Sequence, residues 1–74
     1  MTKSEFVERI QFCEPTFLYK GFYYTISHPD EKFYFCKDDA PEETMRVFSN
    51  VEDMLNVADL HGDRLIDALP EIDF

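Results

Sequence analysis

The sequence contains no apolar run that approaches the roughly 20 residues needed to cross a bilayer. Its first residues, Met1-Thr2-Lys3-Ser4-Glu5, also lack the apolar stretch and small-residue cleavage site of a secretory signal. We therefore expect a cytosolic protein. A chain of 74 residues has room for a single domain, residues 1–74, of marginal stability.

Cysteine and glycine are scarce, with two of each. Cys13 and Cys36 are too few for a disulfide framework, and in a reducing cytosol we expect both to be buried thiols. Neither of them, nor His28 or His61, forms the C-x-x-C or H-x-x-x-H spacing of a zinc site. The two glycines leave no Gly-rich loop for a phosphate group.

Basic residues are scarce as well, and their distribution is uneven. Residues 1–37 carry five acids and five bases, whereas residues 38–74 carry eleven acids and two bases, so the net charge of −9 belongs to the second half. Direct binding of nucleic acid or of an anionic membrane is disfavoured, because both need Lys and Arg. A basic protein partner fits this charge. The alternative is that the acidic surface only keeps the chain soluble.

Tryptophan is absent, but eight phenylalanines and four tyrosines supply large apolar surfaces for so short a chain. Before them, a capping box formed by Thr2 and Glu5 predicts a helix over residues 3–13, which Pro15 ends. The aromatic residues that follow alternate at period two, which is typical of strands with one buried face. Lys20-Gly21 and residues 28–31 supply the turns. The predicted strands are 16–19, 22–27, 32–37 and a short last strand within 44–48.

A second capping box, Ser49 to Glu52, predicts a helix over residues 50–60 with Gly62 as its C′ residue. Asp63 then caps a short third helix, and the tail packs as a brief strand or an extended segment. Together these elements predict an α+β domain of order α-β-β-β(-β)-α-α. Its antiparallel sheet of three to four strands carries the helices on one face.

Several motifs in this chain resemble a group of small uncharacterised proteins encoded in Firmicutes genomes, prophages and mobile elements. The motifs are Tyr19-Lys20-Gly21, Tyr24-x-Ile26-Ser27-His28, Phe33-Tyr34-Phe35-Cys36, and His61-Gly62-Asp63-x-Leu65. The resemblance implies an intracellular protein, often of phage origin, and supplies no catalytic residues. A looser analogy, in architecture alone, links the chain to small acidic anti-CRISPR proteins, some of which mimic DNA on a basic nuclease surface.

No residue pattern indicates an enzyme. Cys36 and His28 flank one turn, but Cys36 alternates with aromatic residues, as a half-buried thiol would. The acidic run from Asp38 to Glu43 lacks the spacing and glycine of an EF-hand and is interpreted as a solvated loop. So short a chain also leaves little volume for the usual pocket of a few hundred Å³. We expect neither cofactor nor metal.

Two binding hypotheses remain. In the first, the acidic half docks on a basic protein through Asp38, Asp39, Glu42, Glu43, Glu52, Asp53, Asp59 and Asp63. For two of these, Glu52 and Asp53, stabilisation of a helix N-terminus is the competing explanation. In the second, the chain forms a homodimer through an exposed aromatic sheet face that contains Tyr19, Tyr23 and Tyr34, with Phe22 if the register shifts by one.

Overall fold

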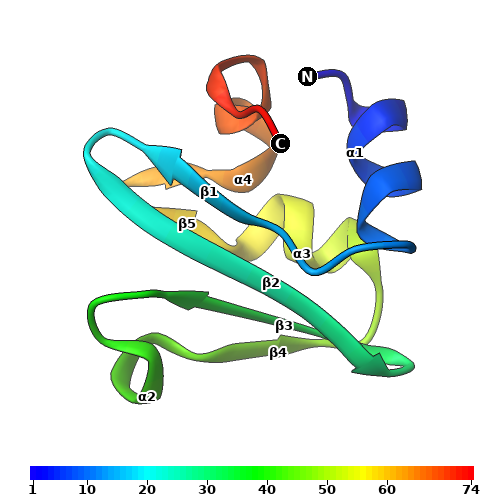
Figure 1. The fold of residues 1–74 in the computed structure, drawn as a ribbon, viewed down its shortest axis with the longest axis horizontal. Coiled ribbons are helices and arrows are strands. Elements are labelled where there is room, and N and C mark those ends of the chain that lie inside the picture. The colour runs from blue at the N-terminus through cyan, green and yellow to red at the C-terminus, as the bar shows by residue number, and fades with distance from the viewer.

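The computed structural model describes residues 1–74 and confirms the predicted α+β class and element order (Figure 1). Four antiparallel strands lie side by side in sequence order: β1 (Thr16–Tyr19), β2 (Phe22–Asp30), β3 (Lys32–Lys37) and β4 (Arg46–Phe48). The helices are α1 (Lys3–Ile10), α2 (Pro41–Thr44), α3 (Val51–Val57), α4 (Leu65–Ala68) and a 3-10 turn, η1 (Leu69–Glu71). A second, two-stranded sheet pairs β5 (Asp59–Leu60) with β6 (Asp63–Arg64).

The strand register divides the main sheet into an inner and an outer face, because successive side chains point to opposite sides. Pairing aligns Phe17 with Tyr24, and Tyr24 with Lys37, on the inner face that packs against the helices. The same face carries the aligned row of Ile26, Phe35 and Arg46. The outer face carries Thr16, Leu18, Tyr23, Thr25, Ser27, Tyr34, Cys36 and Val47.

Stacked aromatic rings form the centre of the core on the inner face. The ring centroids of Phe17 and Tyr24 are 6.0 Å apart, those of Tyr24 and Phe35 are 5.5 Å apart, and Phe74 stacks on Phe17 at 5.8 Å. Helical side chains that are fully buried close the core from the other side, among them Phe6, Met54, Leu55, Leu65 and Ala68.

The first helix begins as predicted, with the Thr2 capping box in place, but it ends at Ile10 rather than at residue 13. The chain leaves the helix to reach Pro15, which is buried and whose carbonyl accepts a hydrogen bond from the Ile26 amide at 3.0 Å. Cys13 consequently lies outside the helix and is exposed, so the prediction that it is buried was wrong.

The second predicted turn is shorter than expected, because β2 continues through His28 and Pro29 to Asp30. A register shift between Ser27 and Asp30 accommodates Pro29, which has no N–H to donate to the ladder. The hairpin then closes around Glu31.

The helix predicted over residues 50–60 is also shorter, and its capping residue differs by one position. Asn50, not Ser49, is the N-cap, and its side chain accepts a hydrogen bond from the Asp53 amide at 2.9 Å. The helix ends at Val57 because Ala58 is already extended and leads into β5.

Gly62 does not end that helix but forms a two-residue hairpin turn between β5 and β6. His61 (φ 53°) and Gly62 (φ 95°) both have positive φ, as Lys20 (φ 49°) and Gly21 (φ 85°) have between β1 and β2. Turns of this kind match the twist of the strands they join and favour glycine. Asp63 therefore lies in β6 and does not cap α4.

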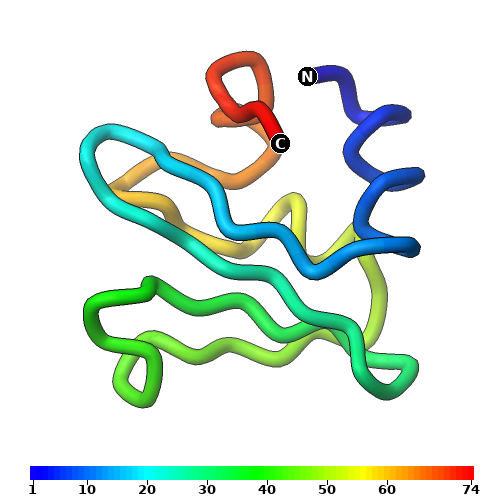
Figure 2. The backbone as a smooth tube through the Cα atoms, in the orientation of Figure 1, coloured from blue at the N-terminus to red at the C-terminus, as the bar shows by residue number.

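The two ends of the chain lie close together (Figure 2). The Met1 ammonium group donates hydrogen bonds to the carbonyl oxygens of Leu69 (2.9 Å) and Ile72 (3.3 Å). The tail packs as expected, with Ile72 buried and extended. None of the helices has the length and apolar character of a membrane-spanning segment.

We expect replacement of Phe17 by alanine to lower the free energy of unfolding by about 3–5 kcal/mol, since it removes a ring stacked on two others. A domain of this size has a total of about 4–11 kcal/mol, so the variant should lose a large share of its stability. Phe12→Ala is the matched control, because Phe12 is 84% exposed, and should change stability by less than about 0.5 kcal/mol. Urea denaturation checks both; equal losses would contradict the assigned core.

Candidate functional site

The eight carboxylates predicted to bind a partner are distributed over several elements of the chain. Four of them, Asp38, Asp39, Glu42 and Glu43, lie within six consecutive residues at and before α2, and we call this group the acidic corner. The other four lie on α3, β5 and β6, on separate elements of the chain (Figure 1).

The carboxylates on α3 have partners within the chain. Glu52 forms an ion pair with Lys3 at 2.8 Å. Asp53 accepts a hydrogen bond from the side-chain amide of Asn50 at 3.2 Å, which completes the cap of α3. Both residues lie in the first helical turn, so the competing explanation, stabilisation of the helix N-terminus, accounts for their position.

Asp63 joins two distant hairpins. Its carboxylate accepts hydrogen bonds from the Tyr19 hydroxyl (2.8 Å) and the Lys20 ammonium (2.6 Å). These two donors hold the pKa of Asp63 below its usual range. Tyr19 is only 4% exposed and lies on the inner face, so its predicted place on an exposed aromatic face was wrong.

The acidic corner is only partly neutralised. Lys37 approaches Asp39 at 3.6 Å, and Asp38 accepts a hydrogen bond from the Thr25 hydroxyl at 2.6 Å. Glu42 and Glu43 form no ion pair. All four side chains of the acidic corner are exposed, so their charge reaches the solvent.

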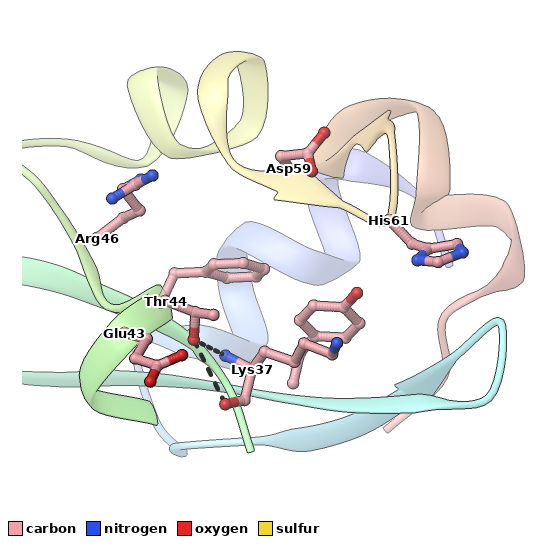
Figure 3. Close-up of a pocket in the computed structure, with 8 residues that line it drawn as sticks. Lys37, Glu43, Thr44, Arg46, Asp59 and His61 are labelled. Atoms are coloured by element: carbon pink, nitrogen blue, oxygen red, sulfur yellow. Dashed lines mark hydrogen bonds between the residues drawn. The ribbon is translucent and has the colours of Figure 1, made fainter. Parts of the chain in front are cut away.

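A pocket of about 320 Å³ lies beside the acidic corner, between α2 and the β5–β6 hairpin (Figure 3). This volume contradicts the expectation that so short a chain leaves little room for a pocket. Figure 3 shows Glu43 and Arg46 on one side, Asp59 and His61 on the other, and Lys37 between them. The remaining lining residues are Tyr24, Phe35 and Thr44.

Sequence reasoning did not single out the cations of this pocket. Lys37 and Arg46 occupy inner-face positions, in line with Tyr24 and Phe35 respectively. A charged residue at a core-facing position of an alternating strand indicates that the core is open at that point. The Lys37 ammonium lies 3.9 Å from the centre of the Phe22 ring, which faces the same side.

Tyr24 is the polar group most deeply placed in the pocket wall. Its side chain is only 3% exposed, stacked between two phenylalanines, and its hydroxyl forms no hydrogen bond within the chain. Burial, with added repulsion from Asp59 and Asp39, raises the pKa of this phenol. Tyr24 therefore stays protonated at neutral pH and can donate a hydrogen bond into the pocket.

The outer face combines apolar and hydroxyl side chains, and two of its hydroxyl groups donate hydrogen bonds to the carboxylates of Asp30 and Asp38. Leu18, Tyr23 and Val47 are 50%, 56% and 52% exposed on it. Tyr34 is half-buried there, with its hydroxyl donating to Asp30 at 2.8 Å. Of the three tyrosines predicted for this face, Tyr23 and Tyr34 are present. Phe22 lies on the inner face with Tyr19, its register partner.

Cys36 and His28 do not meet. Cys36 belongs to the outer face, while the His28 ring stacks on Phe33 with centroids 4.3 Å apart and its Nδ1 lies 2.9 Å from the Lys32 carbonyl oxygen. Burial raises the pKa of the Cys36 thiol, which opposes thiolate formation. No group of three or more His, Cys, Asp or Glu side chains is arranged to hold a metal ion.

Comparison of the chain with protein-family models, curated proteins and solved structures gave no match.

The replacement Asp63→Asn should lower the free energy of unfolding at neutral pH, since the ion pair with Lys20 is lost. The pKa of Asp63 is lower in the folded chain than in the unfolded chain. Its carboxylate therefore stabilises the fold fully at pH values above the unfolded pKa of about 3.9. This stabilisation is lost as the pH falls through the pKa of the folded chain. Urea denaturation at neutral and acid pH measures the difference. Asp67→Asn, which breaks a surface pair with Arg64, is the control and should cost less.

Proposed function

We propose that this chain is a non-catalytic protein-binding domain that docks its acidic corner on a basic surface of a nucleic-acid-binding protein. The observation that carries this proposal is the unequal neutralisation of the carboxylates. Glu52 and Asp63 are paired with lysines and Asp53 accepts a hydrogen bond from the helix cap Asn50, whereas Glu42 and Glu43 are exposed without an ion pair.

The geometry of the acidic corner suits a partner that normally binds phosphates. Four carboxylates project from a short segment between β3 and β4, where the Lys37 amide donates to the Thr44 hydroxyl at 2.8 Å. With a net charge of −9 behind them, they attract a basic protein at long range. A phage-type inhibitor that mimics DNA is the form of this function that we favour, by the analogy in architecture drawn from the sequence.

Capture of a basic protein from a bacterial lysate by this chain should depend on salt, with at least about tenfold weaker binding at high ionic strength, because the attraction is screened. Replacement of the acidic corner by D38N, D39N, E42Q and E43Q together should abolish capture. Circular dichroism should show that the fold persists, since these side chains are exposed.

A matched control removes the same number of charges elsewhere, with Glu8→Gln, Glu31→Gln, Glu71→Gln and Asp73→Asn. These exposed side chains form no ion pair. Capture by the control but not by the acidic-corner variant supports the proposal. Equal loss of capture in both variants would show that only the net charge matters. Capture retained by the acidic-corner variant would refute the proposal.

The outer face favours a second function, self-association into a homodimer. Three large apolar side chains are half-exposed on it, and the carboxylates of Asp30 and Asp38 beside them accept hydrogen bonds from its hydroxyl groups. Two chains of net charge −9 repel each other, and this face lets them meet with few carboxylates in the contact. The two functions are compatible, because a dimer formed through the outer face leaves α2 free.

If the chain dimerises in this way, sedimentation equilibrium should give twice the monomer mass at high concentration, and Tyr23→Lys should return it to monomer. Phe12→Lys is the control, because Phe12 is equally apolar and highly exposed but lies after α1, away from the outer face. A monomer at every concentration, or equal effects of the two variants, would exclude the outer-face dimer.

A further inference from the structure

The pocket beside the acidic corner has the features of a ligand site. It opens on the inner face where the rows of aligned side chains end in Lys37 and Arg46, beyond the part of the sheet that the helices cover. Its volume of about 320 Å³ falls within the range of small-molecule sites, about 300–1,000 Å³.

A hydroxyl group without a partner in the chain, carried by a buried tyrosine, points into this pocket. Every buried side-chain nitrogen and oxygen in the chain has a hydrogen-bond partner. The Tyr24 hydroxyl has none, so it must reach the open space of the pocket, although the tyrosine itself is almost entirely buried. A group held in this way is positioned to bind a polar atom of a ligand.

Charges of both signs remain free around this donor. Arg46 forms no ion pair, although the chain has more than twice as many acids as bases. Across the pocket, Asp59 accepts one hydrogen bond, from the Gly62 amide at 3.3 Å, through Oδ2, and its Oδ1 is free (Figure 3). The Lys37 ammonium is already held by Asp39 and the Phe22 ring.

We propose that this pocket binds a small zwitterion, a free amino acid or a dipeptide. Its carboxylate pairs with Arg46, its ammonium group pairs with Asp59, and the Tyr24 hydroxyl donates to the same carboxylate. A simple anion meets Glu43, Asp59 and the net charge of −9, and a simple cation meets Lys37 and Arg46. A molecule with both charges satisfies both sides.

The test is a titration of the ¹⁵N-labelled chain, without any protein partner, with L-leucine and with glycyl-leucine. Isopentylamine and 4-methylpentanoate, which each keep one charge of leucine, are the matched controls. We expect saturable shifts confined to the amides around Lys37, Arg46 and Asp59, and binding at least about tenfold weaker for either control, since each lacks one charged hydrogen bond. Tighter binding of glycyl-leucine than of leucine would identify a peptide as the ligand, and the reverse a free amino acid.

Variants separate this site from unspecific binding. Tyr24→Phe should fold normally, because the lost hydroxyl has no partner in the chain, and should weaken zwitterion binding about 2–10-fold. Arg46→Gln should remove the preference for leucine over isopentylamine, whereas Arg64→Gln, on β6 outside the pocket, should not. Equal binding of leucine and the single-charge controls, or shifts that do not saturate, would overturn the proposal. Neither result depends on whether the acidic corner binds a protein.

Discussion

The structure depends on one stack of aromatic rings that crosses the inner face of the sheet. Phe17, Tyr24 and Phe35 come from three neighbouring strands, and Phe74 extends the stack from the tail. A chain of 74 residues buries a smaller share of its surface than a larger domain does, and these rings supply large apolar areas to its small core. Helices α1, α3 and α4, the tail and the small hairpin all contribute side chains to the core around this stack, whereas α2 buries none.

The elements that local chemistry determines were predicted from the sequence, and those that tertiary packing determines were not. Period-two alternation located the strands, and Lys20-Gly21 located the first turn. His61-Gly62 has the same chemistry, but the helical spacing before it made a helix cap the simpler interpretation. Helix α3 ends earlier because Leu60 and Leu65, both fully buried, bring the short hairpin back onto the core. Helical periodicity carries no information about such a contact.

The same distinction between local chemistry and tertiary packing applies to the candidate sites. The sequence predicts which residues are acidic but not which cation each of them meets. Tyr19 was assigned to the wrong face, because the face of β1 is decided by pairing Tyr19 with Phe22 across the turn rather than by alternation within the strand. The pocket is lined by residues of β2, β3, α2, β4 and the β5–β6 hairpin, which tertiary packing brings together. Only the sheet register shows that Lys37 and Arg46 point to its interior.

The uneven distribution of charge along the sequence determines which acids are paired with bases in the fold. The pairs Lys3–Glu52, Lys20–Asp63 and Lys37–Asp39 each join a base of the neutral first half to an acid of the second half. Exposed pairs of this kind contribute little stability, about 0–1 kcal/mol, so they align the halves of the chain rather than hold them together. Their larger effect is to determine which carboxylates remain without an ion pair. Because the first half neutralises carboxylates on α3 and β6, Glu42 and Glu43 of the acidic corner keep uncompensated charge beside a pocket that carries both signs of charge. This is the place where the proposed basic partner would dock.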